Sequence, residues 1–272
     1  MILTQNLHTH TTFDDGRNTP KEMAEAAVKA GLTGLGFSGH SPLPYENDWC
    51  LTPERLGPYK GEIDRLRDEY RGRLSIWWGL EKDGLSPIPT MDFDYVIGSL
   101  HHIRVGDAVP CIDESAAVTC DALARYFDGD ERAMTAAYFA QYEAIAADSR
   151  VDIVGHIDLL CKFSETGGPF PADAPFFLDC AARAMEPLVN AGKIFEVNTG
   201  AMSRGLRTQP YPSVPLLRIL RDMGGRVTVT ADAHSAGAVA HAFAEMEILL
   251  RQTGFRETWQ FDGNSFVPVD LT

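Results

Sequence analysis

The feature that most constrains the fold of this chain is an alternation of short apolar segments with helical ones. Seven segments have the length and composition of β-strands, and several are apolar at nearly every position, which is typical of parallel strands covered on both faces. These segments are residues 4–8, 33–38, 74–80, 94–99, 151–155, 193–198 and 226–231. Strands that alternate with helices predict an α/β fold built on a parallel sheet or barrel.

The helical segments have recognisable ends. Thr19-Pro20-Lys21-Glu22 has the pattern of a capping box with proline at the first helical position, and Gly31 follows that helix. Thr52-Pro53 begins a second helix, which we expect to end near Gly72. Further helices are predicted at residues 130–148, 173–191, 213–223 and 237–252.

Residues 104–130 interrupt the alternation, because this stretch is long for a connection between a strand and a helix. Two interpretations stay open: a lid or side wall over a site, and a surface excursion with a short helix. With 272 residues, of which 44% are hydrophobic, the chain can bury one large core. We therefore expect residues 1–272 to form a single domain, with 104–130 as a possible lid or insertion.

Composition excludes several classes of partner. The formal net charge is −14 and the sequence has no cluster of Lys and Arg, so we expect no nucleic acid and no membrane partner. No apolar run approaches the ~20 residues of a membrane span, and the first ten residues lack the basic and apolar regions of a secretory signal. The five scattered cysteines form no CxxC pair and predict reduced thiols in a cytoplasmic protein.

Histidine and carboxylate residues recur where the predicted strands end. His8 and His10 are two residues apart, so on a strand both imidazoles project to the same side. Asp232 and His234 repeat this spacing after the last strand. The strands in between are followed, or ended, by His40, Glu81, His101, His156 and Asn198.

A single histidine at a strand end is more often a hydrogen-bonded polar residue than a metal ligand. Here the candidates fall in phase at one strand end after another, and the carboxyl ends of barrel strands converge on one face. This coincidence predicts a polynuclear metal site at that face. Imidazole and carboxylate ligands without thiolate suit Zn, Fe or Mn, and eight or nine ligands with a shared carboxylate fit two or three divalent ions.

A further ligand is expected in Phe13-Asp14-Asp15-Gly16. We prefer Asp15, which stands beside the glycine, and expect Asp14 to cap the turn that leads to Thr19. His102 directly follows a candidate ligand and is expected to support the ligands or contact substrate. His241 lies in a predicted helix and is expected at the surface.

The order of the short motifs between His8 and His234 resembles that of the polymerase and histidinol phosphatase (PHP) family. These motifs are HxH, FxDG, GH, GxE, GSxH, GHxD and DxH. The resemblance implies a distorted (β/α)7, TIM-like barrel with three metals at the C-terminal ends of its strands. One metal would take His8, His10, Glu81 and Asp232. A second would share Glu81 and take His101 and His156. The third would take Asp15, His40 and His234.

Within that family the chain resembles the monofunctional histidinol-phosphatases of histidine biosynthesis. The supporting stretches are Tyr138-Phe139, residues 155–163 (GHIDLLCKF), residues 196–200 (EVNTG), Arg204 and Tyr211-Pro212. Two stretches differ from the family pattern. Residues 13–16 (FDDG) have Asp where Ser is usual, and residues 201–204 (AMSR) replace a usual Gly-Leu-Arg, which leaves the phosphate-contacting arginine open between Arg204 and Arg207.

The resemblance implies a metal-dependent phosphate monoester hydrolase whose partner is a small phosphorylated metabolite, L-histidinol phosphate. In catalysis, Glu81 would bridge metals, with Asp15 and His234 near the leaving group. The candidate substrate contacts are Arg204, Lys162, His102, Asn198 and Arg207. Two alternatives stay open: a PHP nuclease or nucleotide phosphoesterase, and a metal-binding domain without turnover, which would need missing ligands.

Overall fold

The computed structural model of the protein describes residues 2–45 and 47–271. Its main sheet has seven parallel strands in the order β1 to β7, each paired with the next along the chain. The strands are β1 (Gln5–Asn6), β2 (Gly34–Phe37), β3 (Ser75–Asp83), β4 (Tyr95–Ser99), β5 (Ile153–Val154), β6 (Ile194–Asn198) and β7 (Arg226–Thr230). All seven predicted strands are confirmed.

The sheet curls until its first and last strands meet. Beyond the ends of β1 and β7, Thr9 and Ala233 form a parallel bridge. The backbone N–H of Ala233 donates to the carbonyl of His8 at 3.1 Å, and that of His10 donates to the carbonyl of Ala233 at 3.0 Å. The predicted distorted (β/α)7 barrel is therefore confirmed as a nearly closed barrel. Its first and last strands join at the HxH motif that follows β1 and the DxH motif that follows β7.

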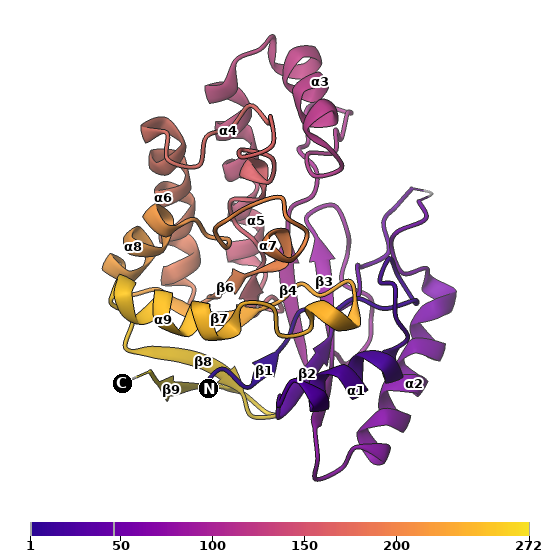
Figure 1. Ribbon diagram of the computed structural model, residues 1–272. Coiled ribbons are helices and arrows are strands. Elements are labelled where there is room, and N and C mark those ends of the chain that lie inside the picture. Colours follow the sequence, from indigo (N-terminus) through magenta and orange to yellow (C-terminus); the bar gives the residue numbers. More distant parts are fainter. Residues whose placement is uncertain (1, 46, 272) are drawn as a thin grey trace.

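Helices cover the outside of the barrel (Figure 1). The capping box is confirmed: Glu22 Oε2 accepts from the backbone N–H of Thr19 at 2.8 Å, and Thr19 Oγ1 accepts from that of Glu22 at 3.3 Å. The covering helices are α1 (Pro20–Lys29), α2 (Pro53–Glu69), α4 (Glu131–Ala140), α5 (Tyr142–Ala147), α6 (Pro175–Asn190), α8 (Val214–Asp222) and α9 (Phe243–Thr253). Among the described residues, no helix is both long enough and apolar enough to cross a membrane.

Two predicted helices differ from the structure. The helix predicted at 130–148 is divided into α4 and α5 at Gln141. The helix predicted from residue 237 begins only at Phe243, because a short 3-10 turn, Ala236–Ala238, and a left-handed residue, Ala242, precede it. The prediction that His241 lies on a surface helix is therefore wrong, since it is half-buried in a turn.

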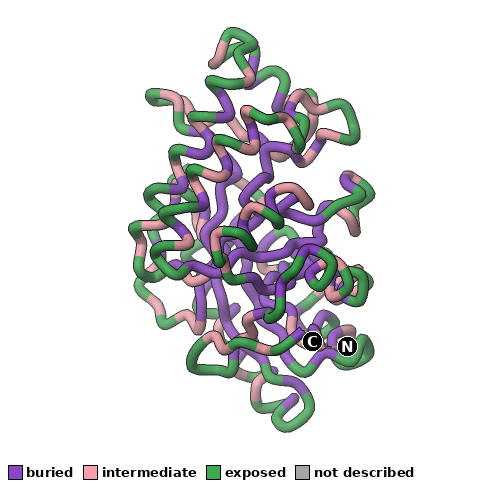
Figure 2. The backbone as a smooth tube through the Cα atoms, turned by 90° about the vertical axis from the view of Figure 1, so that its left-hand side faces the viewer, coloured by how far each residue is buried: buried purple, intermediate pink, exposed green. Residues whose placement is uncertain are grey.

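A small apolar cluster fills the inside of the barrel. It consists of Trp77, Tyr95, Ile97 and Ile153 from the strands, together with Leu7, just after β1, and Phe261. Phe261 belongs to a hairpin of β8 (Glu257–Phe261) and β9 (Phe266–Asp270) that the sequence analysis did not predict. The hairpin packs at the amino-terminal ends of the strands (Figure 1), so the barrel opens at its opposite end. In Figure 2 the buried residues, drawn in purple, gather in the centre of the molecule, and exposed residues lie around them.

Residues 104–130 carry a helix, α3 (Ala116–Phe127), and short extended pairings at His102–Cys111 and Val105–Ala108. Ser115 begins α3 and its hydroxyl accepts from the backbone N–H of Val118 at 3.2 Å. In Figure 1, α3 stands beyond the carboxyl ends of β3 and β4. Two shorter elements also lie near this end of the barrel, the 3-10 turn η1 (Leu159–Cys161) and α7 (Gly200–Ser203).

Candidate metal centre

The histidines and carboxylates singled out from the sequence converge at the carboxyl end of the barrel. Three groups have potential ligand atoms within 4.8 Å of one another. The groups are His10, Asp15, His40 and His234; His8, His10 and Asp232; and His40, Glu81 and His101. The expectation that Glu81 follows a strand is wrong, because β3 continues to Asp83 and Glu81 lies inside it.

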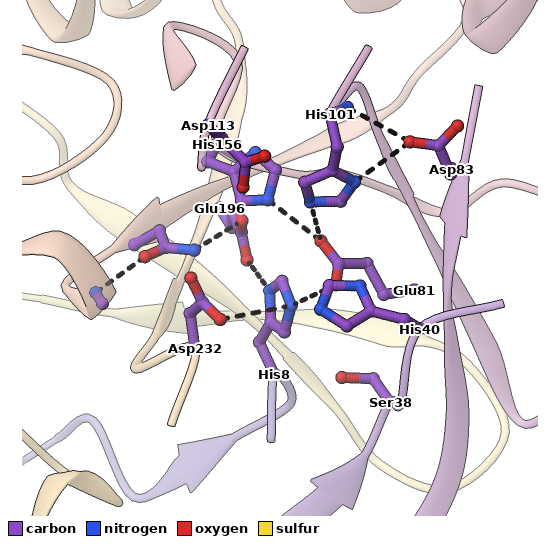
Figure 3. Close-up of polar contacts among 12 residues, drawn as sticks. His8, Ser38, His40, Glu81, Asp83, His101, Asp113, His156, Glu196 and Asp232 are labelled. Atoms are coloured by element: carbon purple, nitrogen blue, oxygen red, sulfur yellow. Dashed lines mark hydrogen bonds and ion pairs between the residues drawn. The ribbon is translucent and has the colours of Figure 1, made fainter. Parts of the chain in front are cut away.

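Glu81 lies at the centre of these groups and is 1% exposed (Figure 3). Its Oε1 is 2.9 Å from Nε2 of His156 and 3.4 Å from Nε2 of His101. Its Oε2 is 2.8 Å from Nδ1 of His40 and 3.2 Å from Nε2 of His8. Nε2 of His10 is 3.6 Å from the same Oε2. One buried carboxylate from β3 therefore faces five imidazoles that come from other parts of the barrel.

Asp232 faces the same space from the end of β7. Its Oδ1 is 3.3 Å from Nε2 of His10, 3.7 Å from Nε2 of His8 and 3.4 Å from Nδ1 of His234. The backbone of Asp232 is left-handed, with φ of 45°, a conformation that Asp tolerates better than most residues. A Cβ added to Gly200 would lie 2.6 Å from Asp232 Oδ2, so only glycine leaves room for this carboxylate.

Asp15 and Asp14 have different positions. Asp15 is partly exposed, and its Oδ2 lies 3.2 Å from Nε2 of His234, on the open side of the cluster. Asp14 is buried, with Oδ2 2.6 Å from Nδ1 of His10 and Oδ1 accepting from the backbone N–H of Thr11 at 2.8 Å. The expectation that Asp14 caps the turn before Thr19 is therefore wrong, because the Asp14 carboxylate contacts the imidazole of His10 and the backbone of Thr11 instead.

Sequence reasoning missed two further buried carboxylates. Oδ2 of Asp83 lies 3.1 Å from Nδ1 of His101, and Oε2 of Glu196 lies 2.8 Å from Nδ1 of His8. Two features of the sequence could have indicated them. Asp83 stands two residues after Glu81 and so lies on the same face of a strand. Glu196 is a charged residue inside a largely apolar strand segment, 193–198.

Buried charges of opposite sign set the pKa values of the cluster. Burial by itself would raise the pKa of Glu81, but His40 and His8 outweigh it and hold that pKa well below its ordinary value. Burial would lower the pKa of His10, but Asp14 and Asp232 raise it to about 10. Glu81 and Asp232, whose pKa values are lowered, are therefore ionised at neutral pH, and His8, His10 and His101, whose pKa values are raised, hold protons unless another cation takes their place. Burial and the nearby His10 instead lower the pKa of His234.

The donor atoms fit divalent metal ions. Buried atoms without a hydrogen-bond partner among the described residues include Nε2 of His8, Nε2 of His10 and Oε2 of Glu81. Leaving such atoms unpaired is costly, and a metal ion that accepts their lone pairs removes that cost. Imidazole nitrogens with carboxylate oxygens are the donor set of zinc, iron and manganese sites.

A cavity of about 810 Å³ opens over the cluster. Of the predicted substrate contacts, His102, Lys162 and Arg204 line it. The other two are placed elsewhere. Arg207 is buried, 3.4 Å from Oδ2 of Asp158, with its guanidinium 4.4 Å from the ring centre of Tyr211. Asn198 is buried beneath the cluster and donates to Glu196 Oε1 at 2.8 Å.

Residues 104–130 form part of the cavity wall, through Cys111, Asp113 and Glu114. Asp113 holds Lys162, whose Nζ donates to the carbonyl of Asp113 at 2.7 Å and lies 3.3 Å from its Oδ2. This segment therefore reaches the cavity with three side chains.

An aromatic wall lies across the cavity. His102 Nε2 is 2.9 Å from the hydroxyl of Tyr45, and the ring of Trp49 stacks on His102 with centroids 6.1 Å apart. The imidazole of His102 is thus fixed by contacts with Tyr45 and Trp49, two aromatic residues that also line the cavity.

The fold and the cluster define an α/β barrel with a metal-binding face at the carboxyl ends of its strands. The family model described as the PHP domain matches residues 6–200. The chain belongs to the PHP family, as the resemblance in its motifs implied.

The chain is similar to proteins named as histidinol-phosphatases. It is 31% identical over 261 residues to the probable histidinol-phosphatase of Deinococcus radiodurans, which covers 92% of this chain and 93% of that protein. It is 26% identical over 262 residues to the histidinol-phosphatase of Bacillus subtilis, and the match covers 87% of this chain and 95% of that protein. The fold matches the Lactococcus lactis histidinol phosphate phosphatase, solved with zinc, L-histidinol and phosphate, with a TM-score of 0.70 and 21% identity over 97% of this chain and 99% of that one.

Proposed function

We propose that this chain is a metal-dependent phosphatase that hydrolyses L-histidinol phosphate to L-histidinol and inorganic phosphate. The observation that carries the proposal is a buried His/Asp/Glu cluster beneath a cavity whose wall holds three cationic side chains, Arg17, Lys162 and Arg204. The names of the relatives, which match nearly the whole chain, supply the substrate. The activity is that of a phosphoric monoester hydrolase in histidine biosynthesis.

The cluster would hold two or three divalent ions. We assign His8, His10, Glu81 and Asp232 to one ion, His101 and His156 with the shared Glu81 to a second, and Asp15, His40 and His234 to a third. Bound divalent ions lower the pKa of coordinated water and neutralise charge on phosphoryl oxygens. Zinc is the first candidate, because the Lactococcus lactis enzyme was solved with it, and iron and manganese suit the same donors.

Arg204 and Lys162 would bind the non-bridging phosphate oxygens. The guanidinium of Arg204 lies 3.2 Å from Oδ2 of Asp232 and 3.1 Å from Nδ1 of His234, at the edge of the cluster and on the cavity wall. Lys162 is oriented by Asp113. Charge-assisted hydrogen bonds from such groups are the strong contacts that phosphate recognition uses.

Asp15 and His234 lie where a leaving group can reach them. They contact each other at 3.2 Å, and their side chains are 30% and 23% exposed at the cavity. As ligands of the third ion, Asp15 and His234 would hold it near the departing alkoxide, whose negative charge the ion would neutralise. His102, with Tyr45 and Trp49, would contact the organic part of the substrate. Direct substrate contact is not proposed for Arg207 or Asn198, which are buried away from the cavity.

Steady-state hydrolysis of a small substrate panel tests this function. The panel is L-histidinol phosphate, a nucleoside monophosphate, p-nitrophenyl phosphate and a DNA oligonucleotide, assayed with protein whose metals have been counted. We expect L-histidinol phosphate to have the highest kcat/KM by orders of magnitude. Preference for the nucleotide or the oligonucleotide would replace the substrate and keep the metal centre. Bound metal without any ester hydrolysis would overturn the enzymatic assignment.

A further inference from the structure

Glu196 is a buried carboxylate that connects four strands of the barrel. It belongs to β6, and its Oε2 accepts from Thr230 Oγ1 of β7 at 2.8 Å and contacts Nδ1 of His8, beyond β1, at 2.8 Å. Its Oε1 accepts from the backbone N–H of His156, beyond β5, at 2.7 Å and from Asn198 Nδ2 at 2.8 Å. The side chain has no exposed surface, and every contact satisfies one of its lone pairs.

The contact with His8 fixes which nitrogen faces the cluster. A carboxylate that accepts from Nδ1 keeps the proton there, so Nε2 carries the lone pair. Nε2 of His8 is the atom that lies 3.2 Å from Glu81 Oε2 and has no hydrogen-bond partner among the described residues. His10 and His101 repeat this arrangement, with Asp14 and Asp83 at their Nδ1 atoms.

All three carboxylates also accept from the backbone N–H of a candidate ligand: Asp14 Oδ2 from His40 at 3.2 Å and Asp83 Oδ2 from His101 at 3.2 Å. Glu196 accepts from that of His156 and, in addition, from the side chains of Thr230 and Asn198. Figure 3 shows Glu196 between His8 and His156, behind the face that both present to Glu81. One side chain thus orients an imidazole from the first strand and anchors the backbone that carries another from the fifth.

We propose that Glu196 is a positioning residue of the metal centre, which sets the tautomer of His8 and the place of His156 without binding metal or substrate itself. The inference rests on the metal centre in the proposed function. In Glu196→Gln, an amide N–H group facing Nδ1 of His8 would donate to it and move the imidazole proton to Nε2. The lone pair that a metal needs would then be lost, although the shape and size of the side chain are kept.

Titration of Zn²⁺ into chelator-stripped protein, followed by calorimetry, tests this role. We expect Glu196→Gln to bind at least one zinc about 10- to 100-fold more weakly than wild type, the range typical for carboxylates that support metal-bound histidines. The melting temperature of the stripped variant should stay near that of stripped wild type. Asp152→Asn is the matched control, because Asp152 Oδ2 also accepts a strand N–H, from Val96 at 2.9 Å, but lies at the opposite end of β5.

Three outcomes separate the possibilities. Equal zinc affinity in wild type and Glu196→Gln would overturn the positioning role alone. If wild type itself bound no zinc, the proposed metal centre would be overturned, and this inference with it. If Glu196→Gln does not fold, a crystal structure of zinc-loaded wild type decides. Zinc on Nε2 of His8, with Nδ1 still on Glu196, supports the role; zinc on Nδ1, or on Glu196 itself, contradicts it.

Discussion

The guanidinium of Arg204 lies 3.2 Å from Oδ2 of Asp232, whose other oxygen faces His10 at 3.3 Å. A cation on the cavity wall is therefore tied to a carboxylate of the cluster. This contact places the proposed phosphate-binding group directly beside the proposed metal ligands and distinguishes Arg204 from Arg207, which pairs with Asp158 in the interior.

Replacing Arg204 should weaken substrate binding without emptying the metal centre. A charge-assisted hydrogen bond contributes about 1.5–3 kcal/mol, so we expect Arg204→Gln to lower kcat/KM for L-histidinol phosphate about 10- to 100-fold. Zinc content, measured by elemental analysis, should not change. Arg125→Gln is the control, because Arg125 is exposed and pairs only along its own helix with Asp121. Full activity in Arg204→Gln would remove this residue from the phosphate site.

Glu81 should be required for metal binding and not for folding. Glu81→Gln keeps the volume of the side chain but removes the negative charge that faces five imidazoles, so we expect loss of at least one ion and of most activity. Circular dichroism of the variant should match wild type. Wild-type turnover with full metal content would contradict the bridging role of Glu81.

Room for Asp232 depends on the absence of a side chain at residue 200. In Gly200→Ala the new Cβ would lie 2.6 Å from Asp232 Oδ2, so the carboxylate must move and zinc affinity should fall. At Gly61, in α2, a Cβ would meet nothing within 4 Å, and Gly61→Ala should stabilise the protein by about 0.5–1 kcal/mol with unchanged zinc affinity. If Gly200→Ala bound zinc as tightly as Gly61→Ala, the carboxylate of Asp232 would not depend on the space beside Gly200.

Stabilisation by metal should grow with pH. The pKa of His10 is raised to about 10 in the metal-free protein, against an ordinary 6.5, so its protonated form stabilises that protein fully below pH 6.5 and this stability is lost as pH rises toward 10. A metal-bound imidazole needs no proton. The difference in melting temperature between zinc-loaded and chelator-stripped protein should therefore increase from pH 6.5 to 10. A difference that is constant over this range would contradict the assignment of His10 as a ligand.

The hairpin of β8 and β9 should contribute to stability and not to the site. Phe261 is 3% exposed and packs with Trp77 and Tyr95 inside the barrel. Phe261→Ala should lower the free energy of unfolding by about 3–5 kcal/mol in chemical denaturation. Phe266→Ala, at a half-buried position on the same hairpin, should cost less. Loss of zinc in Phe261→Ala under native conditions would show that the two ends of the barrel are coupled.

The sequence by itself determined the seven strands, their alternation with helices and the residues that gather at one end of them. All three follow from local patterns: apolar segments of strand length, capping residues at helix ends, and pairs such as His8 and His10 whose spacing places them on one side of a strand. Because all the strands run in parallel, whatever follows a strand lies at the same end of the barrel. The positions of the candidate ligands could therefore be predicted before any contact between them was known.

Only the tertiary structure decided which partner each group has. His8 and Glu196 are 188 residues apart and meet through the closure of the barrel. Arg204 lines the cavity, whereas Arg207 pairs with Asp158 in the interior. The role of Asp14 and the hairpin that closes the lower end of the barrel were likewise hidden in the sequence. Such contacts depend on strand register and on the path of loops in space, and no local periodicity of the chain encodes either.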